Sequence, residues 1–257
     1  MRIFVTGASG FIGGHLCPAL AAAGHELRAS ADGCDAVVHL ANIAHVNASP
    51  AELHRVNVEG TIAQARSALS AGVRRFVYLS SIKGARPDDA YGRAKSVAEQ
   101  AILQLDGLEA VILRPPLVYG PRVKAKFLAL MRAIDRGWPL PLASVSNRRS
   151  LVYVGNLADA IMRCVESSVV RKSYAVTDGA PVSTPDLCRA LGRALGRPAR
   201  LFAFPPGLVR LAPGFARLTE SLETDDRAIR EELGWRPPFT FAEGLKVTAT
   251  WYRAQGG

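Results

Sequence analysis

Residues 1–16, MRIFVTGASGFIGGHL, decide the fold that we expect for this chain. The short apolar run Ile3–Val5 is typical of a strand buried on both faces of a parallel sheet. Three glycines and a helix-forming stretch follow it. Gly7 permits a tight turn, Gly10 permits a ligand to approach the backbone, and Gly13 permits the helix to pack closely on the strand. Because the first N–H groups of such a helix suit a pyrophosphate, the stretch predicts a dinucleotide-binding turn.

The composition fits one substantial hydrophobic core. The chain has 257 residues, of which 49% are hydrophobic. No apolar run reaches the ~18 residues that a membrane span needs, and the chain begins inside its first strand, so we expect no signal peptide and a cytoplasmic protein. The cysteines are far apart in the sequence and form no CxxC pair, which favours reduced thiols and no metal site.

The net charge of +10 raises the question of an acidic partner. The basic residues are scattered, and no basic stripe is interleaved with aromatic residues, as nucleic-acid binding would favour. A solvated surface with a few phosphate-binding arginines explains the charge. We therefore expect neither nucleic acid nor a membrane as a partner.

Strand-like and helix-like stretches alternate through the first half of the chain. Strands are expected at 26–30, 36–40, 75–79 and 110–113, and helices at 51–69 and 91–105. This alternation predicts an α/β Rossmann fold, a doubly wound parallel sheet with helices on both faces and ligands at the carboxyl ends of the strands. Only residues 31–35 separate two of these strands, too few for the usual crossover, so the crossover there is expected to be shortened.

The composition of the sequence changes after Pro116, where Pro and Gly recur between short predicted helices and strands. Helices are expected at 126–136, 156–165, 185–195, 224–233 and 241–253, and short strands at 174–176 and 201–204. We expect a cofactor-binding domain over residues 1–118, to which 150–176 return. Residues 119–149 and 177–257 would then form a small substrate-binding lobe.

Tyr91 and Lys95 lie four residues apart at the start of a predicted helix, so both project from one face. An ammonium near a phenol favours phenolate and lowers the pKa of the tyrosine from about 10, which suits proton transfer near neutral pH. Such a pair is usually a solvated helix face. Here Ser80 and Ser81 precede it at the end of a strand, where sheets of this kind bind ligands, and this order favours a catalytic set.

The stretches TGASGFIGG, LSSIKG, YGRAKSVAE and LRPPLVYGP together resemble the extended short-chain dehydrogenase/reductase superfamily. The resemblance is to its NAD-dependent epimerase/dehydratase family, whose UDP-glucose 4-epimerase-like members act on nucleotide sugars. It implies that Tyr91 is the acid and base on a substrate hydroxyl. It also implies that Lys95 binds the nicotinamide ribose and lowers the pKa of the tyrosine, and that Ser81 orients the substrate.

The same resemblance implies NAD as the cofactor, with NADP as the alternative. The residues that it assigns to the cofactor are Gly7, Gly10, Phe11, Ile12, Gly13, Asp32, Leu40, Ala41, Asn57, Tyr91, Lys95, Pro115 and Val118. Those that it assigns to the substrate are Ser81, Lys126, Arg149 and Arg217. Arginine suits this task because its planar fork binds phosphate through two hydrogen bonds. Two positions depart from the family pattern: Lys126 stands where many relatives have Asn, and Asp32 lies one residue beyond the position that usually selects NAD.

We therefore expect an NAD(P)-dependent nucleotide-sugar 4-epimerase of the UDP-glucose or UDP-N-acetylglucosamine type, working through a transient 4-keto sugar. Residues 81–83, Ser-Ile-Lys, lack the Thr-Asp-Glu of the related dehydratases, which counts against dehydration. One alternative is a reductase of a nucleotide-linked 4-keto sugar, and another is a non-catalytic dinucleotide-binding or RNA-binding relative. Because relatives commonly dimerise through the helices expected at 51–69 and 91–105, a homodimer is expected.

Overall fold

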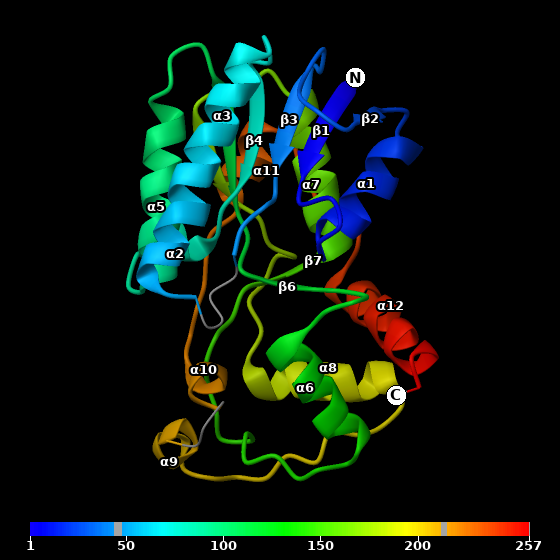
Figure 1. The fold of residues 1–257 in the computed structure, drawn as a ribbon. Helices are drawn as coiled ribbons and strands as arrows, with labels where there is room; N and C mark the ends of the chain where they lie inside the picture. The colour runs from blue at the N-terminus through cyan, green and yellow to red at the C-terminus, as the bar shows by residue number, and fades with distance from the viewer. Residues whose placement is uncertain (44–47, 212–214, 257) are drawn as a thin grey trace. The chain divides into compact units, whose positions relative to one another are not determined.

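The computed structural model describes residues 1–43, 48–211 and 215–256 (Figure 1). They form two compact units. Unit 1 contains residues 1–116, 157–176 and 225–236, and unit 2 contains residues 117–156, 177–224 and 237–257.

The division departs from the expected domain boundaries in two places. The segment that returns to unit 1 is 157–176, not 150–176, and residues 225–236 also belong to unit 1 instead of to the lobe. Side chains explain the second difference. Glu232 accepts a hydrogen bond from Tyr174 Oη at 2.8 Å, and the indole of Trp235 donates to Asp159 at 2.8 Å. These contacts join residues 225–236 to the returning segment.

Unit 1 is built on a six-stranded sheet in the order β2-β1-β3-β4-β5-β8, with every pairing parallel. The strands are β1 (Arg2–Thr6), β2 (Glu26–Arg28), β3 (Ala36–His39), β4 (Arg75–Leu79), β5 (Glu109–Arg114) and β8 (Lys172–Ala175). The buried strands read as nearly continuous apolar runs because helices cover both faces. The predicted α/β parallel sheet is confirmed.

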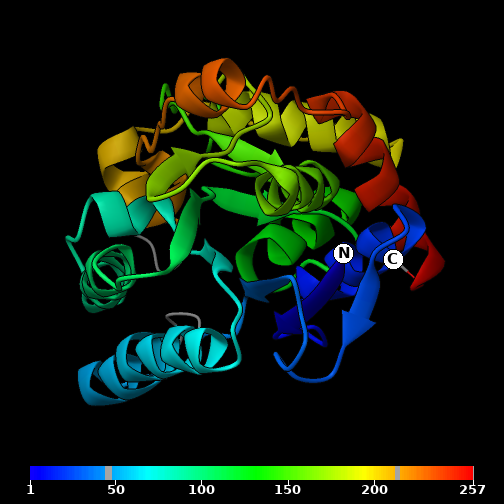
Figure 2. The same ribbon diagram turned by 90° about the horizontal axis from the view of Figure 1, so that it is seen from above.

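Helices flank this sheet on both sides, as the two views show (Figure 2). They are α1 (Gly13–Ala22), α2 (Pro50–His54), the π-helical turn η1 (Arg55–Glu59), α3 (Gly60–Ser70), α4 (Ile82–Ala85), α5 (Ala90–Leu103), α7 (Val154–Glu166) and α11 (Arg227–Glu232). Alanines of α3 and α5 pack with Phe76 and Ile112 of the sheet in one core. The single helix predicted over 51–69 is a continuous rod with η1 in the middle.

Residues 29–35 connect β2 to β3 without a helix or strand between them. Both strands pair with β1, from opposite sides, so this link crosses the sheet next to β1. Gly33 turns the chain at a φ of 66°, and Ala31 and Cys34 are buried in the core formed with α3 and α5. The strand predicted over 26–30 ends at Arg28.

Unit 2 holds the parallel pair β6 (Leu117–Tyr119) and β7 (Leu151–Tyr153), which the sequence analysis missed. Its helices are α6 (Ala125–Asp135), α8 (Thr184–Leu195), α9 (Pro206–Leu211), α10 (Ala216–Thr219) and α12 (Phe241–Ala254). The strand predicted over 201–204 is wrong, since Leu201 makes one isolated bridge, to Leu140.

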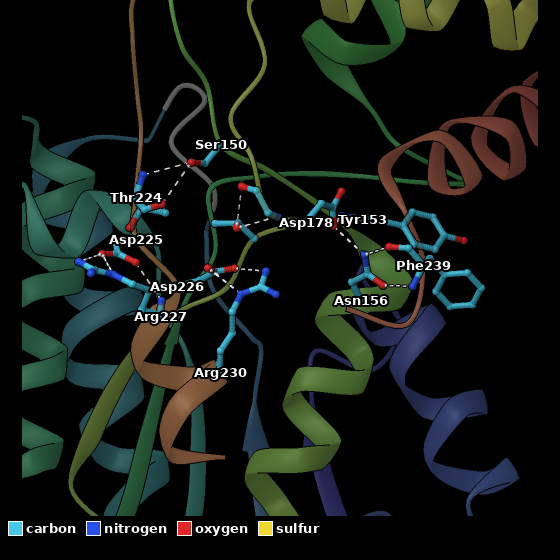
Figure 3. A network of polar contacts seen from close by, with 12 residues as sticks. Ser150, Tyr153, Asn156, Asp178, Thr224, Asp225, Asp226, Arg227, Arg230 and Phe239 are labelled. Carbon is cyan, nitrogen blue, oxygen red and sulfur yellow. Dashed lines mark hydrogen bonds and ion pairs between the residues drawn. The ribbon is translucent and has the colours of Figure 1, made fainter. Parts of the chain in front are cut away.

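Buried polar groups join distant segments of unit 2 (Figure 3). Asp178 accepts hydrogen bonds from Tyr119 Oη at 2.7 Å, from the Tyr153 backbone at 2.8 Å and from Asn156 Nδ2 at 2.7 Å. Asn156 also binds the backbone N–H and C=O of Phe239, at 2.9 and 2.8 Å. One carboxylate and one amide therefore connect β6, β7 and the chain before α12.

The Gly13 position tests the packing of α1 on the glycine turn. A Cβ there would lie 2.4 Å from Gly7 O and 2.5 Å from Ala8 O, and backbone atoms cannot move aside cheaply. We expect Gly13→Ala to lower the free energy of unfolding by about 3 kcal/mol in urea titrations. Gly60→Ala is the matched control, because its Cβ would meet only Arg55 O at 3.7 Å within a helix, and it should stabilise the protein by up to about 1 kcal/mol. Equal unfolding midpoints for the two variants would contradict this packing.

Candidate active site

The glycine turn packs directly against the chain that leaves β3. Gly7 has a φ of 72°, and a Cβ on it would lie 2.9 Å from the Ala41 nitrogen. Ala41 N–H also donates to Thr6 Oγ1 at 3.3 Å. Three residues predicted for the cofactor, Gly7, Leu40 and Ala41, thus lie together at the carboxyl ends of β1 and β3.

Next along the turn, Gly10 is exposed, and a Cβ on it would meet only Gly7 O, at 3.1 Å. Helix α1 begins three residues later with neither a side-chain cap nor an acidic residue in its first turn. The N–H groups of a first helical turn have no intrahelical acceptor, so this end of α1 offers donors and a partial positive charge. The turn fits a phosphate group, and Phe11 and Ile12 lie half-buried in it.

Lys95 is completely buried on α5. Its Nζ donates to the Leu79 carbonyl at 3.0 Å and lies 4.7 Å from the centre of the Tyr78 ring and 5.9 Å from that of the Tyr91 ring. Burial lowers the pKa of Lys95 to about 7, although the carboxylate of Glu99 acts in the opposite direction. Tyr91 and Lys95 therefore share one face of the helix, as their spacing predicts.

The expected direction of the Tyr91 pKa is wrong for this structure. Burial, together with the nearby charge of Asp89, raises the pKa of Tyr91 to about 12. Burial removes the phenolate from water, and the ammonium of Lys95 is itself buried and bonded to a carbonyl. Tyr91 is consequently a neutral phenol that holds its proton near neutral pH.

Two adjacent serines at the end of β4 have different partners. Ser80 is buried and donates its hydroxyl to Glu99. Ser81 is half-buried and caps α4, where its Oγ accepts from the Lys83 N–H at 3.3 Å. The hydroxyl of Ser80 is thus taken up inside the protein, and the contact of Ser81 with a substrate stays a prediction.

Glu99 and Arg114 form a buried ion pair that the sequence analysis missed. Glu99 is 2% exposed, and Arg114 Nε lies 3.1 and 3.0 Å from its two carboxylate oxygens. Helix α4 packs on this pair, since a Cβ on Gly84 would lie 2.6 Å from Glu99 Oε1. The available signal was that Glu99 follows Lys95 by four residues, which puts both on one helix face.

His39 lies in a chain of hydrogen bonds whose directions can be assigned. Thr61 Oγ1 donates to the Asn57 carbonyl at 2.9 Å, so it accepts from His39 Nε2 at 3.2 Å. His39 Nδ1 then accepts from Thr6 Oγ1 at 2.7 Å. Burial and the charge of Lys95 lower the pKa of His39 to about 3. His39 is therefore a buried histidine with a hydrogen-bond partner at each ring nitrogen.

Asn57 is fully buried in the π-helical turn η1. Its amide holds the backbone of Ile43 on both sides, accepting from the N–H at 2.8 Å and donating to the C=O at 3.0 Å. Asn57 thus fixes the segment that leaves Ala41. Its predicted contact with the cofactor stays a prediction.

The remaining cofactor candidates are distributed over both units. Asp32 is exposed in the link 29–35 and accepts from Ser30 Oγ at 3.1 Å, while Arg28 pairs with Glu26 at 2.7 Å. Pro115 accepts a backbone hydrogen bond from Ile82 at 3.1 Å, which ties the end of β5 to α4. Val118 belongs to unit 2.

The predicted diphosphate ligands lie in unit 2. Arg149 donates through one Nη to the backbone carbonyls of Arg217 and Glu220, the second at 3.2 Å, and burial lowers its pKa. This contact brings Arg149 and Arg217 together. Lys126 is exposed in the first turn of α6. Their role in substrate binding stays a prediction.

Comparison with known proteins identifies the family. The model of the NAD dependent epimerase/dehydratase family matches residues 3–33 and 28–176. UDP-glucose 4-epimerase of Vibrio cholerae is 39% identical over 83% of this chain and 75% of its own length. The chain belongs to the NAD-dependent epimerase/dehydratase family. It is an enzyme of the extended short-chain dehydrogenase/reductase type.

Further relatives of this epimerase/dehydratase chain differ in reaction. Ceramide reductase of Caulobacter vibrioides is 27% identical over 99% of this chain and 95% of its own length. The crystal structure of UDP-N-acetylglucosamine 4-epimerase from Bacillus cereus superposes with a TM-score of 0.83 at 19% identity, covering 98% of this chain and 99% of that one. The latter likeness supports the Rossmann-type fold.

Among the residues that the structure describes, no group of three His, Cys, Asp or Glu side chains is arranged to hold a metal ion.

The buried neutral His39 makes stability depend on pH. Its pKa is about 3 in the folded protein and about 6.5 in an unfolded chain, so the unfolded state binds the extra proton between these values. The contribution of neutral His39 to the free energy of unfolding is fully present above pH 6.5. It is lost as the pH falls below this value, by up to about 1.4 kcal/mol per pH unit. We expect the stability difference between the wild type and His39→Gln to shrink from pH 6.5 to pH 4 in urea titrations. The exposed His54→Gln serves as control, and a pH-independent difference for His39→Gln would contradict the assignment.

Proposed function

We propose that this family member is an NAD-dependent nucleotide-sugar 4-epimerase that uses Tyr91 as its acid and base. The observation that carries the proposal is the arrangement of Tyr91 beside buried Lys95, with Ser81 at the end of β4, in the same unit as the glycine turn. The likeness to a UDP-glucose 4-epimerase at 39% identity supports a UDP-hexose or UDP-N-acetylhexosamine substrate.

The proton steps follow from the state of the two side chains. Tyr91 enters as a neutral phenol, so it must first release its proton to solvent, and the phenolate that forms can then take the proton of the C4 hydroxyl of a sugar. Lys95, with a pKa of about 7, is partly charged near neutrality and stabilises a developing phenolate when protonated. Ser81 Oγ hydrogen-bonds the sugar oxygen as it becomes a carbonyl. A bound NAD supplies the hydride acceptor and donor, which no side chain provides.

Epimerisation needs one proton to leave and return at the same oxygen. Tyr91 accepts the C4 hydroxyl proton, the 4-keto sugar turns over, and Tyr91 returns the proton when the alcohol forms again. One acid-base residue therefore serves both directions. We also propose that Arg149, Arg217 and Lys126 bind the diphosphate or the sugar of the substrate.

The choice of NAD over NADP is supported by the charges at the end of β2. The guanidinium of Arg28 is paired with Glu26, whereas Asp32 presents an exposed carboxylate suited to ribose hydroxyls. We propose a homodimer through α5 and the α2–α3 rod, where Val97 of α5 is 46% exposed.

A reductase of a nucleotide-linked 4-keto sugar is the second candidate. The link 29–35 contributes no helix beside β2, and this leaves the adenine side of a cofactor with fewer protein neighbours. A reductase must exchange its cofactor at each turnover, which a more open site favours. The likeness to ceramide reductase also fits a reductase.

The two candidates differ in their need for added cofactor. We expect the purified protein to interconvert UDP-glucose and UDP-galactose, or the N-acetylated pair, with no added reduced cofactor, as measured by coupled assay or NMR. Tyr91→Phe should lower the turnover number by at least about 100-fold while nucleotide-sugar binding persists, because general acid-base catalysis contributes about 10²–10⁴. Oxidation of NADPH by a UDP-4-keto sugar, without interconversion of the two UDP-sugars, would contradict the epimerase proposal and support the reductase.

The adjacent serines offer a matched pair of variants. We expect Ser81→Ala to lower the turnover number with a smaller change in melting temperature than Ser80→Ala, since Ser81 is half-buried and its hydroxyl caps only the four-residue helix α4. Ser80→Ala should instead lower the melting temperature by several degrees, because Glu99 would lose a buried donor at a cost of about 1–3 kcal/mol. A loss of turnover confined to Ser80→Ala would reverse the assignment of the substrate-facing serine.

A further inference from the structure

One end of unit 2 exposes large apolar side chains in two adjoining segments. Leu211 is 79% exposed, Trp138 55%, Leu208 54%, Phe202 44% and Phe204 39%. Soluble proteins rarely leave such residues grouped on the surface without a use for them. We call this group, with Arg136, Arg200 and Arg210, the basic apolar surface.

Backbone contacts hold the two segments side by side (Figure 1). Leu140 N–H donates to the Arg200 carbonyl at 2.8 Å, and Phe202 N–H donates back to the Leu140 carbonyl at 3.1 Å. Phe202 and Phe204 then pack edge to face, with ring centres 6.3 Å apart. These contacts hold residues 138–140 beside residues 200–204, about 60 positions further along the sequence, and α9 follows directly after them in the chain.

Helix α9 directs its apolar residues outward. Leu208 and Leu211 are three residues apart and share one face, whereas Val209 is the buried residue of this helix. The two leucines of this helix therefore remain in water.

The residues around these side chains carry a net positive charge, although Asp135, next to Arg136, pairs with Arg197 at 3.6 Å. Residues 193–220 contain five arginines and one acidic residue, Glu220. Arg136 lies 5.5 Å from the Trp138 ring, and a Cβ on Gly137 would lie 3.9 Å from Arg200. Arg210 has an exposed partner, Glu220, at 3.8 Å, which leaves it available to another anion.

We propose that the basic apolar surface docks this protein on an anionic membrane. Arginines attract anionic headgroups, and the aromatic and leucine side chains enter the boundary between headgroups and acyl chains. The leucines favour a membrane over RNA, since RNA binding uses stacking on aromatic rings and gains little from aliphatic tips. The positive charge of this surface also favours an anionic membrane over a second copy of this chain, which is itself basic. Among the described residues, no helix is long and apolar enough to span a bilayer, so the contact is peripheral.

The test is sedimentation with vesicles of phosphatidylglycerol and phosphatidylcholine, using the full chain. The wild type should sediment with vesicles rich in phosphatidylglycerol and much less with pure phosphatidylcholine or at high salt. Leu208→Ser with Leu211→Ser should weaken binding about 100-fold, since each leucine that leaves water contributes roughly tenfold. Arg136→Gln and Arg200→Gln should each weaken binding about fivefold on anionic vesicles.

The matched control changes exposed apolar residues elsewhere. Val170→Ser with Val247→Ser, at 43% and 41% exposure, should bind vesicles like the wild type. The proposal is overturned if the wild type fails to sediment with anionic vesicles, or if the leucine variant binds as well as the wild type. Binding of single-stranded RNA without vesicle binding would also overturn it. So would a changed oligomeric mass of the leucine variant without vesicle binding. Epimerase activity is a separate readout, so failure of either proposal is recognised independently.

Discussion

The burial of one ammonium group governs the chemistry of unit 1. Lys95 is 0% exposed and donates to a backbone carbonyl, and it lies over the Tyr78 ring. A charge taken out of water is costly, so its pKa falls to about 7. The same positive charge helps to keep His39 neutral. Glu99, one helical turn further on, is the anion that opposes the loss of the Lys95 proton.

Glu99 links this charge to the loop that carries the serines. It binds the Ser80 hydroxyl and a fork from Arg114, so it is itself compensated in the core. Gly84 allows α4 to lie directly on it, and Gly92 of α5 approaches the Lys83 carbonyl in the same way, with a Cβ position only 2.7 Å away. Close backbone approach at these two glycines therefore lets α4 and α5 pack against each other, with Ser81 as the cap of α4 and Tyr91 in the first turn of α5.

Much of the fold could be predicted because its signals are local. Apolar runs and their spacing indicated the parallel sheet, and the glycine spacing indicated the turn before α1. The division into units was predicted less well. Residues 225–236 join unit 1 through Tyr174–Glu232 and Asp159–Trp235 contacts, which connect residues more than 50 positions apart. No periodicity within one segment reports such contacts.

By itself, the sequence determined the Rossmann class, the glycine turn and the pairing of Tyr91 with Lys95, because strand composition and i,i+4 spacing act over a few residues. Only the tertiary structure decided that Ser80 turns inward to Glu99, that Tyr91 remains a phenol, and that residues around Trp138 and α9 form the basic apolar surface. Burial and long-range neighbours set protonation and exposure, and these depend on how distant segments pack together.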